Sequence, residues 1–376
     1  MKTEIMFQNN KIEILDTTLR EGEQSRGILF TTAQKIKIAE KLDAFGVDYI
    51  ELGHPVASPS IRKAVAEISS LGLRAQTVAH ARAKKEDIDI IRKCNTAWAG
   101  IFSGINSFSL DYRLHSDRKT VLTNILNTIK YAKDCGLKVR FTCEDASRTG
   151  RKELIDLYAM AVAAGADRIC LADTVGILTP SKTKELIAYI KKYITADMHA
   201  HFHNDFGLAA ANALAAYEAG ARAIDVSING LGERSGVAAL AEVCMALRQL
   251  YEVNNIWDLK LLPELSAMVS RFTSSPIEYS RPIVGRNVFS HKGGIHSASV
   301  MKNPETYEPF PPEILGIGRT IVISRLIGRR GFEGLLHSDG KLSHKDVACL
   351  VKKLKRSGSK EFTDKEIEKV MRIYQN

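Results

Sequence analysis

The sequence predicts an α/β protein built on a closed (β/α)8 TIM barrel with a helical C-terminal extension. Short apolar segments alternate with amphipathic ones over the first two-thirds of the chain, and such alternation favours parallel strands. Eight strand–helix units fill roughly 250 residues, the usual length of this barrel. No glycine-rich phosphate loop follows the first strand, which argues against the runner-up, an open doubly wound sheet.

Each predicted strand is short and is followed by a helix-like segment. The strands are Glu13–Asp16, Asp48–Leu52, Ala75–Ala79, Trp98–Phe102, Lys138–Thr142, Arg168–Ala172, Met198–Phe202 and Ala223–Ile228. The helices cover residues 32–45, 60–71, 84–94, 119–135, 151–164, 180–193, 207–219 and 235–251. The alternation stops after about residue 255, and two polar helices are predicted over 343–374. We therefore expect a catalytic barrel, 1–255, and a helical extension, 256–376.

Composition indicates a cytoplasmic globular protein. Hydrophobic residues make up 45% and charged residues 26% of the 376 residues, which are ordinary values. No apolar run reaches the roughly 18 residues needed to span a bilayer, and the polar N-terminus lacks a signal-peptide core. The six cysteines are scattered, so we expect neither disulfides nor a thiolate zinc site.

The net charge of +10 allows two interpretations. One is a nucleic-acid-binding protein that has lost catalysis. The other is a mixed, solvated surface, because most basic residues lie beside acids, as in Lys84-Lys85-Glu86-Asp87. A basic balance also suits small anionic substrates by raising their local concentration. We favour the second interpretation and expect no nucleic acid and no membrane among the partners.

Polar side chains collect at the C-terminal ends of the predicted strands, where TIM barrels place their active sites. His201 and His203 end the seventh strand, and side-chain alternation projects both to one face. One carboxylate with these two imidazoles suits a divalent ion that polarises a carbonyl. Further polar ends are Asp16 to Gln24, His80, Arg140 to Asp145, Asp173-Thr174 and Asn229 to Arg234. Any one of these residues alone would indicate a structural ion pair or cap, but their recurrence favours one site.

Several motifs resemble those of the metal-dependent acyl-CoA condensing enzymes, which include isopropylmalate, homocitrate and citramalate synthases. In the barrel these are Asp-Thr-Thr-Leu-Arg-Glu-Gly-Glu-Gln at 16–24, His-Phe-His-Asn-Asp at 201–205 and Gly-Leu-Gly-Glu-Arg at 230–234. In the extension they are His-Lys-Gly-Gly-Ile-His at 291–296 and Asn-Pro-Glu-Thr-Tyr-Glu-Pro at 303–309. The resemblance implies acetyl-CoA as co-substrate and a homodimer in which the extension covers the partner's barrel.

The resemblance assigns metal and ketone contacts to matching positions. Glu21, His201 and His203 would ligate the divalent metal, for which Mg, Mn, Zn and Co all remain open. The metal and Arg20 would polarise the ketone of a 2-oxo acid, and Thr174 would hold its carboxylate.

The resemblance also implies the reaction. Glu144 and His296 are the candidate bases that remove a proton from the acetyl methyl group, and Tyr307 would assist. The enolate would attack the ketone, and hydrolysis of the thioester would release CoA. A base must reach the proton that it removes, so this assignment depends on distances that the fold decides.

The acceptor is predicted from the residues that face its second substituent. His80 and Arg140 resemble the pair that homocitrate synthases use for the distal carboxylate of 2-oxoglutarate, and a bidentate arginine suits a carboxylate. Thr142 stands where those enzymes often have serine, and Gln24 joins the substrate-binding set. We therefore expect homocitrate as the product, with 2-oxoisovalerate, pyruvate and oxaloacetate as alternative acceptors. One departure is Ser-Gly-Val at 235–237, where many relatives have a Gly-Asn step.

Overall fold

The computed structural model describes residues 12–292, 294–322 and 352. The chain divides into two compact units between Ile277 and Glu278. This division falls later than the expected boundary at 255, because α9 (Leu262–Thr273) contacts α1 (Thr32–Phe45) and belongs to the first unit. The polar helices predicted over 343–374 lie outside the described residues, apart from Lys352.

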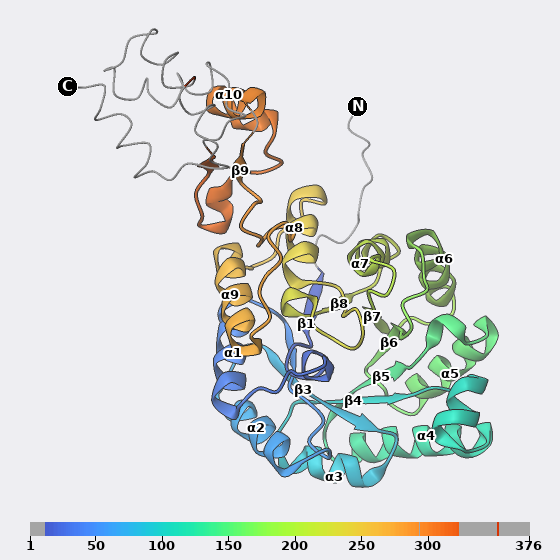
Figure 1. The fold of residues 1–376 in the computed structure, drawn as a ribbon. Coiled ribbons are helices and arrows are strands. Elements are labelled where there is room, and N and C mark those ends of the chain that lie inside the picture. The colour runs from blue at the N-terminus through green and yellow to red at the C-terminus, as the bar shows by residue number, and fades with distance from the viewer. Residues whose placement is uncertain (1–11, 293, 323–351, 353–376) are drawn as a thin grey trace. The chain divides into compact units, whose positions relative to one another are not determined.

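Eight parallel strands close into a barrel in sequence order (Figure 1). They are β1 (Glu13–Asp16), β2 (Tyr49–Glu51), β3 (Gln76–Arg82), β4 (Trp98–Ser103), β5 (Lys138–Cys143), β6 (Arg168–Asp173), β7 (Asp197–Phe202) and β8 (Ala223–Val226). Closure is made by β1 and β8, which pair in parallel over four residues of each strand. The predicted barrel is therefore confirmed, and the open sheet is excluded.

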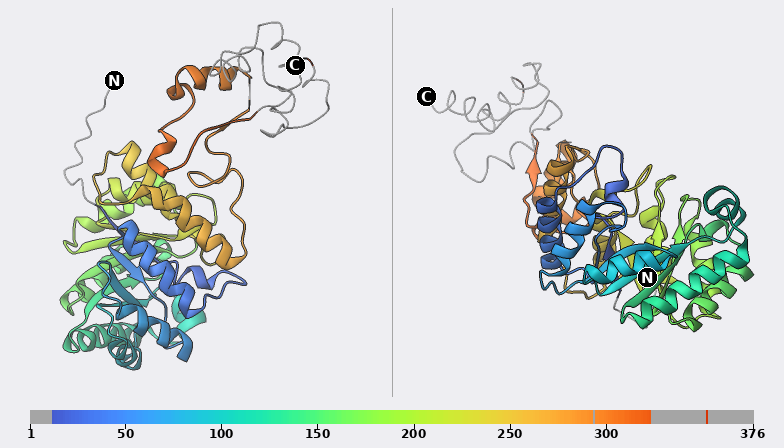
Figure 2. Two further views of the ribbon diagram at one scale, coloured as in Figure 1. Left: turned by 90° about the vertical axis from the view of Figure 1, so that its left-hand side faces the viewer. Right: turned by 90° about the horizontal axis from the view of Figure 1, so that it is seen from below.

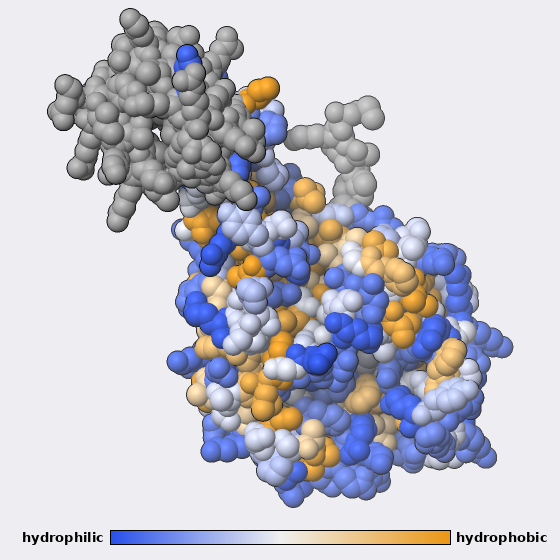
Figure 3. Space-filling view, in the orientation of Figure 1, coloured by the Kyte–Doolittle hydropathy of each residue, from blue (hydrophilic) through white to orange (hydrophobic). Residues whose placement is uncertain are grey.

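An outer ring of helices surrounds the strands in the views of Figures 1 and 2. After α1 come α2 (Pro59–Ser69), α3 (Lys85–Lys93), α4 (Arg118–Asp134), α5 (Arg151–Ala163), α6 (Pro180–Lys191), α7 (Ala209–Glu218) and α8 (Leu240–Leu250). On the face shown in Figure 3, hydrophilic residues are spread over these helices with smaller apolar groups between them. None of the described helices is long and apolar enough to cross a membrane.

The helix starts follow capping signals in the sequence. Thr31, Ser58, Asp117 and Thr179 each accept a hydrogen bond from a backbone N–H three residues later. A side-chain cap of this kind stabilises a helix by about 1 kcal/mol. Gly46 ends α1 with φ 102°, a left-handed conformation that glycine adopts without the steric cost of a Cβ.

Apolar and charged side chains share the N-terminal half of the barrel interior. Leu15, Tyr49, Val78 and Trp98 form one buried cluster, and the Arg168 guanidinium lies 5.1 Å from the Tyr49 ring centroid. The cavity lies at the other end of the strands, where the polar strand ends line it.

The loop between β4 and α4 contains an element that the sequence analysis did not predict. Residues Phe108–Leu114 form a π-helix that ends at His115, whose φ is 46°. Its i→i+5 hydrogen bonds produce no periodicity that the strand and helix patterns would reveal. Such turns occur often at functional sites, and this one lies beside Glu144, as described below.

The second unit is described from Glu278 to Val322 without Gly293, and at Lys352. It contains a short parallel pair, β9 (Ser290–His291) and β10 (Thr320–Ile321), and the helix α10 (Gly294–Lys302). The buried Glu308 carboxylate accepts hydrogen bonds from the Arg319 guanidinium and lies 2.9 Å from His291 Nε2. This ion-pair cluster ties the strand pair to the segment that follows α10.

Candidate metal and substrate site

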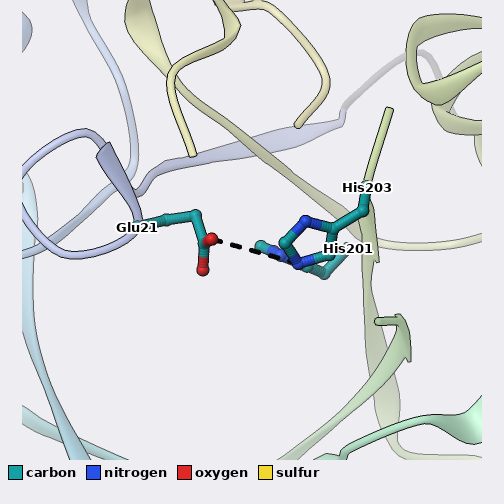
Figure 4. Close-up of side chains that lie close together, drawn as sticks. All are labelled: Glu21, His201 and His203. Carbon is teal, nitrogen blue, oxygen red and sulfur yellow. Dashed lines mark ion pairs between the residues drawn. The ribbon is translucent and has the colours of Figure 1, made fainter. Parts of the chain in front are cut away.

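Three predicted ligands meet at the C-terminal ends of β1 and β7. One ligand atom from each of Glu21, His201 and His203 lies within 4.8 Å of the others, and all three residues are buried. Figure 4 shows the Glu21 carboxylate pointing toward the two imidazole rings. The closest Glu21–His203 contact, between Oε1 and Nε2, is 4.0 Å. The three side chains therefore converge on one point.

The protonation states of this group suit a cation. Burial would raise the pKa of Glu21, but Arg20 and the two histidines lower it to about 2, so the carboxylate is ionised at neutral pH. Burial lowers the pKa of His203 to about 3, so its imidazole is neutral. An ionised carboxylate and a neutral imidazole are the ligand forms of these side chains.

The surroundings leave room for an ion at this point. Nδ1 of His203 is buried without a hydrogen-bond partner, and Nδ1 of His201 lies 3.3 Å from Asp225 Oδ2, the kind of carboxylate contact that orients a ligating histidine. A Cβ at Gly232 would lie 3.1 Å from Glu21 Cγ, so glycine keeps space for the Glu21 side chain. The donor set of one carboxylate and two imidazoles therefore fits a divalent ion.

Val237 lies in the Ser-Gly-Val stretch at 235–237, the departure from the family motif noted in the sequence. It is 2% exposed and pairs through its backbone with His203. This residue offers no ligand atom, so the described set remains one carboxylate and two imidazoles.

Glu51 on β2 is the centre of the charge network beside the metal ligands, and the sequence analysis missed it. Its fully buried carboxylate accepts hydrogen bonds from Thr17 Oγ1 and Arg20 Nε, each at 2.7 Å. His80 Nδ1 lies 3.1 Å and Arg140 Nη2 3.3 Å from its other oxygen. The available signal was an acid inside the apolar strand Tyr-Ile-Glu-Leu at 49–52, which is costly to bury unless it is paired.

Arg140 lies at the floor of the site with its two terminal nitrogens already paired. Nη1 donates to Asp225 Oδ2 at 2.9 Å, and Nη2 donates to Glu51. The side chain is 2% exposed. Nε of Arg140 and Oγ1 of Thr142, two residues along the same strand, are buried without a hydrogen-bond partner. Two unpaired buried donors at a cavity wall are costly, and a polar ligand group would satisfy them.

His80 is held in one orientation between Glu51 and an aromatic ring. Its ring stacks on Phe102 with 4.3 Å between the centroids, and burial lowers its pKa to about 4. Burial would raise the pKa of Glu51, but the surrounding cations hold it well below the usual range. The ionised Glu51 can only accept, so a neutral His80 donates through Nδ1 and presents Nε2 as an acceptor.

Three predicted residues follow β1, β5 and β6. The Gln24 side chain accepts a hydrogen bond from Arg20 Nη1 at 3.1 Å. Thr174 Oγ1 accepts the backbone N–H of Asp145 at 2.8 Å, which leaves the hydroxyl proton for another acceptor. The Glu144 carboxylate lies 2.5 Å from Arg113 Nη2, and burial raises its pKa above the usual value.

One cavity of about 440 Å³ brings the barrel's predicted residues together. Its lining includes Arg20, Glu21, Gln24, His80, Arg140, Thr142, Glu144, Thr174, His201 and His203. His296 and Tyr307 belong to the second unit, where their ring centroids are 4.2 Å apart. The roles of all twelve residues remain predictions.

Comparison with known proteins decides the family. An HMGL-like family model matches residues 11–269. The chain belongs to the HMGL-like family. A second model, described as a homocitrate synthase post-HMGL domain, matches residues 283–361.

Relatives with different product names are about equally similar to this chain. The homocitrate synthase AksA of Methanopyrus kandleri is 38% identical over 366 residues, 96% of this chain and 92% of the relative. The 2-isopropylmalate synthase of Methanocaldococcus jannaschii is 40% identical over 369 residues, 96% of this chain and 71% of the relative. The chain is therefore an acyltransferase of the condensing type, and identity alone does not separate the products.

Solved structures support the barrel fold. The HMG-CoA lyase of Bacillus subtilis superposes with a TM-score of 0.66 at 20% identity, over 73% of this chain and 97% of the lyase.

Proposed function

We propose that this protein condenses acetyl-CoA with 2-oxoglutarate and hydrolyses the thioester, which gives homocitrate and CoA. The observation that carries the choice of acceptor is the polar wall that β5 contributes to the cavity. There Arg140 Nε and Thr142 Oγ1 are buried donors without partners, and both residues line the cavity. An apolar substituent would leave these donors unsatisfied, whereas a second carboxylate would accept from them.

Different residues of the cavity carry out different steps of the reaction. Arg20 and the Thr174 hydroxyl bind the ketone and carboxylate end of the 2-oxo acid. A divalent ion held by Glu21, His201 and His203 would act as a Lewis acid on the ketone oxygen when it is bound. The Glu144 carboxylate takes a proton from the acetyl methyl group, and Arg20 stabilises the alkoxide that forms as the carbon–carbon bond closes.

Measurement of CoA release with a panel of 2-oxo acids tests this proposal. We expect kcat/KM for 2-oxoglutarate to exceed that for 2-oxoisovalerate and pyruvate by at least about tenfold, because a charged hydrogen bond contributes about 1.5–3 kcal/mol. Oxaloacetate also carries a second carboxylate, so its kcat/KM tests the reach of the site rather than its charge. Equal or better use of 2-oxoisovalerate would make 2-isopropylmalate the product instead. The apolar cavity residues Leu29, Ala57 and Ile61 favour that acceptor as the second candidate.

The buried charges of the site predict proton uptake when a dicarboxylate binds. Arg20 and Arg140 oppose three ionised carboxylates, Glu21, Glu51 and Asp225, so these side chains sum to one negative charge. A divalent ion with a monocarboxylate brings the sum to zero. With a dicarboxylate, the net charge reaches zero only if one further proton is bound. Neutral His80 is the group that takes up this proton, because it must be protonated at Nε2 to donate to a carboxylate.

We therefore expect up to one proton to be taken up per 2-oxoglutarate bound, and none per 2-oxoisovalerate. In the free protein His80 has a pKa of about 4, and the second carboxylate of the bound acceptor raises that pKa. As the pH rises from the lower to the higher of these two values, affinity for 2-oxoglutarate falls by up to about tenfold per pH unit. Calorimetric titration of the metal-loaded protein in buffers of different ionisation enthalpy measures the uptake. His80→Gln should remove it, and equal uptake with both ligands would contradict the charge argument.

A further inference from the structure

The π-helix of the β4–α4 loop is fastened to the segment that carries Glu144. The buried Asn106 side chain donates to the Asp145 carboxylate at 2.7 Å and accepts the backbone N–H of Ser109 at 2.9 Å. On the other side, Arg148 donates to Asp145 and lies over the Phe108 ring, 4.2 Å from its centroid. These contacts fix the π-helix relative to the end of β5.

The π-helix places Arg113 between the candidate base and the acceptor wall. Nη2 of Arg113 lies 2.5 Å from Glu144 Oε2. Its guanidinium carbon lies 5.9 Å from the Phe102 ring centroid, and Phe102 stacks on His80. An α-helical turn spaces its residues differently from a π turn, so this irregular element decides where the arginine reaches.

The described charges that act on Glu144 come from three elements. Arg113 on the π-helix and Arg20 after β1 favour the ionised carboxylate, whereas the neighbouring Asp145 disfavours it, as does burial. Arg113 is the cation in direct contact with it. Removal of Arg113 would leave a partly buried carboxylate facing a like charge, with only the more distant Arg20 in opposition.

We propose that Arg113 is a positioning residue that keeps Glu144 ionised and aimed into the cavity, ready to accept the acetyl methyl proton. This inference rests on the proposed role of Glu144 as the base. Arg113 itself touches neither the metal ligands nor Thr174 among the contacts of the described residues, so it acts through Glu144.

The pH profile of kcat/KM for acetyl-CoA separates this role from a structural one. We expect Arg113→Met to move the acidic limb up by about one pH unit, because a partly exposed opposite charge in contact shifts a carboxyl pKa by about that amount. At pH values below the limb, activity falls about tenfold, and it returns at higher pH. Arg113→Lys should keep the limb near its original position, because the positive charge remains.

Arg118→Met is the matched control. Arg118 begins α4 directly after this loop, is 41% exposed against 37% for Arg113, and also lies 2.5 Å from a glutamate, Glu153. Its profile should match the unaltered protein. If Arg113→Met does not fold, Arg113→Gln removes the charge while it retains a hydrogen-bonding group, and it gives the same readout.

Glu144→Gln distinguishes the possible failures. If this variant is inactive and Arg113→Met keeps the original acidic limb, the inference about Arg113 is wrong and the base assignment stands. If Glu144→Gln retains full activity, the base assignment itself is wrong, and the role of Arg113 falls with it.

Discussion

His203→Ala should abolish stoichiometric metal binding and lower CoA release by at least about a hundredfold. Loss of a group that merely orients a ligand typically costs 10–100-fold in affinity or activity, and His203 is placed as a ligand itself. Its imidazole is buried and neutral and lies 4.0 Å from the Glu21 carboxylate. Without it, one carboxylate and one imidazole remain in the described set.

Metal content after dialysis, and calorimetric titration with Mn²⁺, measure this loss directly and independently of activity. Treatment of the unaltered protein with a chelator should reproduce the inactivity, and added Mn²⁺ should reverse it. The variant should keep its helical circular dichroism, because no hydrogen bond to His203 Nδ1 is lost. Full metal content together with full activity in His203→Ala would exclude this site.

Arg140→Met should lower the free energy of unfolding by about 3–5 kcal/mol, the usual cost of leaving a buried charge without its partner. Two fully buried carboxylates, Glu51 and Asp225, lose their shared cation. Arg140→Lys should also be destabilised, because one ammonium cannot reproduce two separate guanidinium contacts. Urea unfolding followed by circular dichroism measures the change.

A double variant separates stability from specificity. Arg140→Met combined with Glu51→Gln removes one of the two carboxylates that lose Arg140 and should recover part of the lost stability. It should not recover affinity for 2-oxoglutarate, for which we expect KM to stay about 10–100-fold raised, in line with the strength of charged hydrogen bonds. Recovery of both properties would mean that Arg140 only balances the buried acids and does not bind the acceptor.

Local sequence pattern predicted some residues of the candidate site and missed others. The alternation of side chains placed His201 and His203 on one face, and the strand-end rule placed Arg20, Glu21 and Arg140 at the same mouth. The sequence analysis missed Glu51 because its contacts lie 29 to 89 residues away in sequence. An isolated acid in a strand does not indicate its partners. The sequence also could not show that Arg140 already pairs with two carboxylates.

The sequence by itself determined the eight-strand barrel, most helix bounds, and the residue types gathered at the strand ends, because periodicity and capping are local properties of the chain. The tertiary structure decided which of those residues touch. Ring closure between β1 and β8 brings Glu51, Arg140 and Asp225 into one network, and a π-helix without a sequence signature brings Arg113 to Glu144. Protonation states follow from that arrangement, because burial and neighbouring charges exist only once distant segments are packed together.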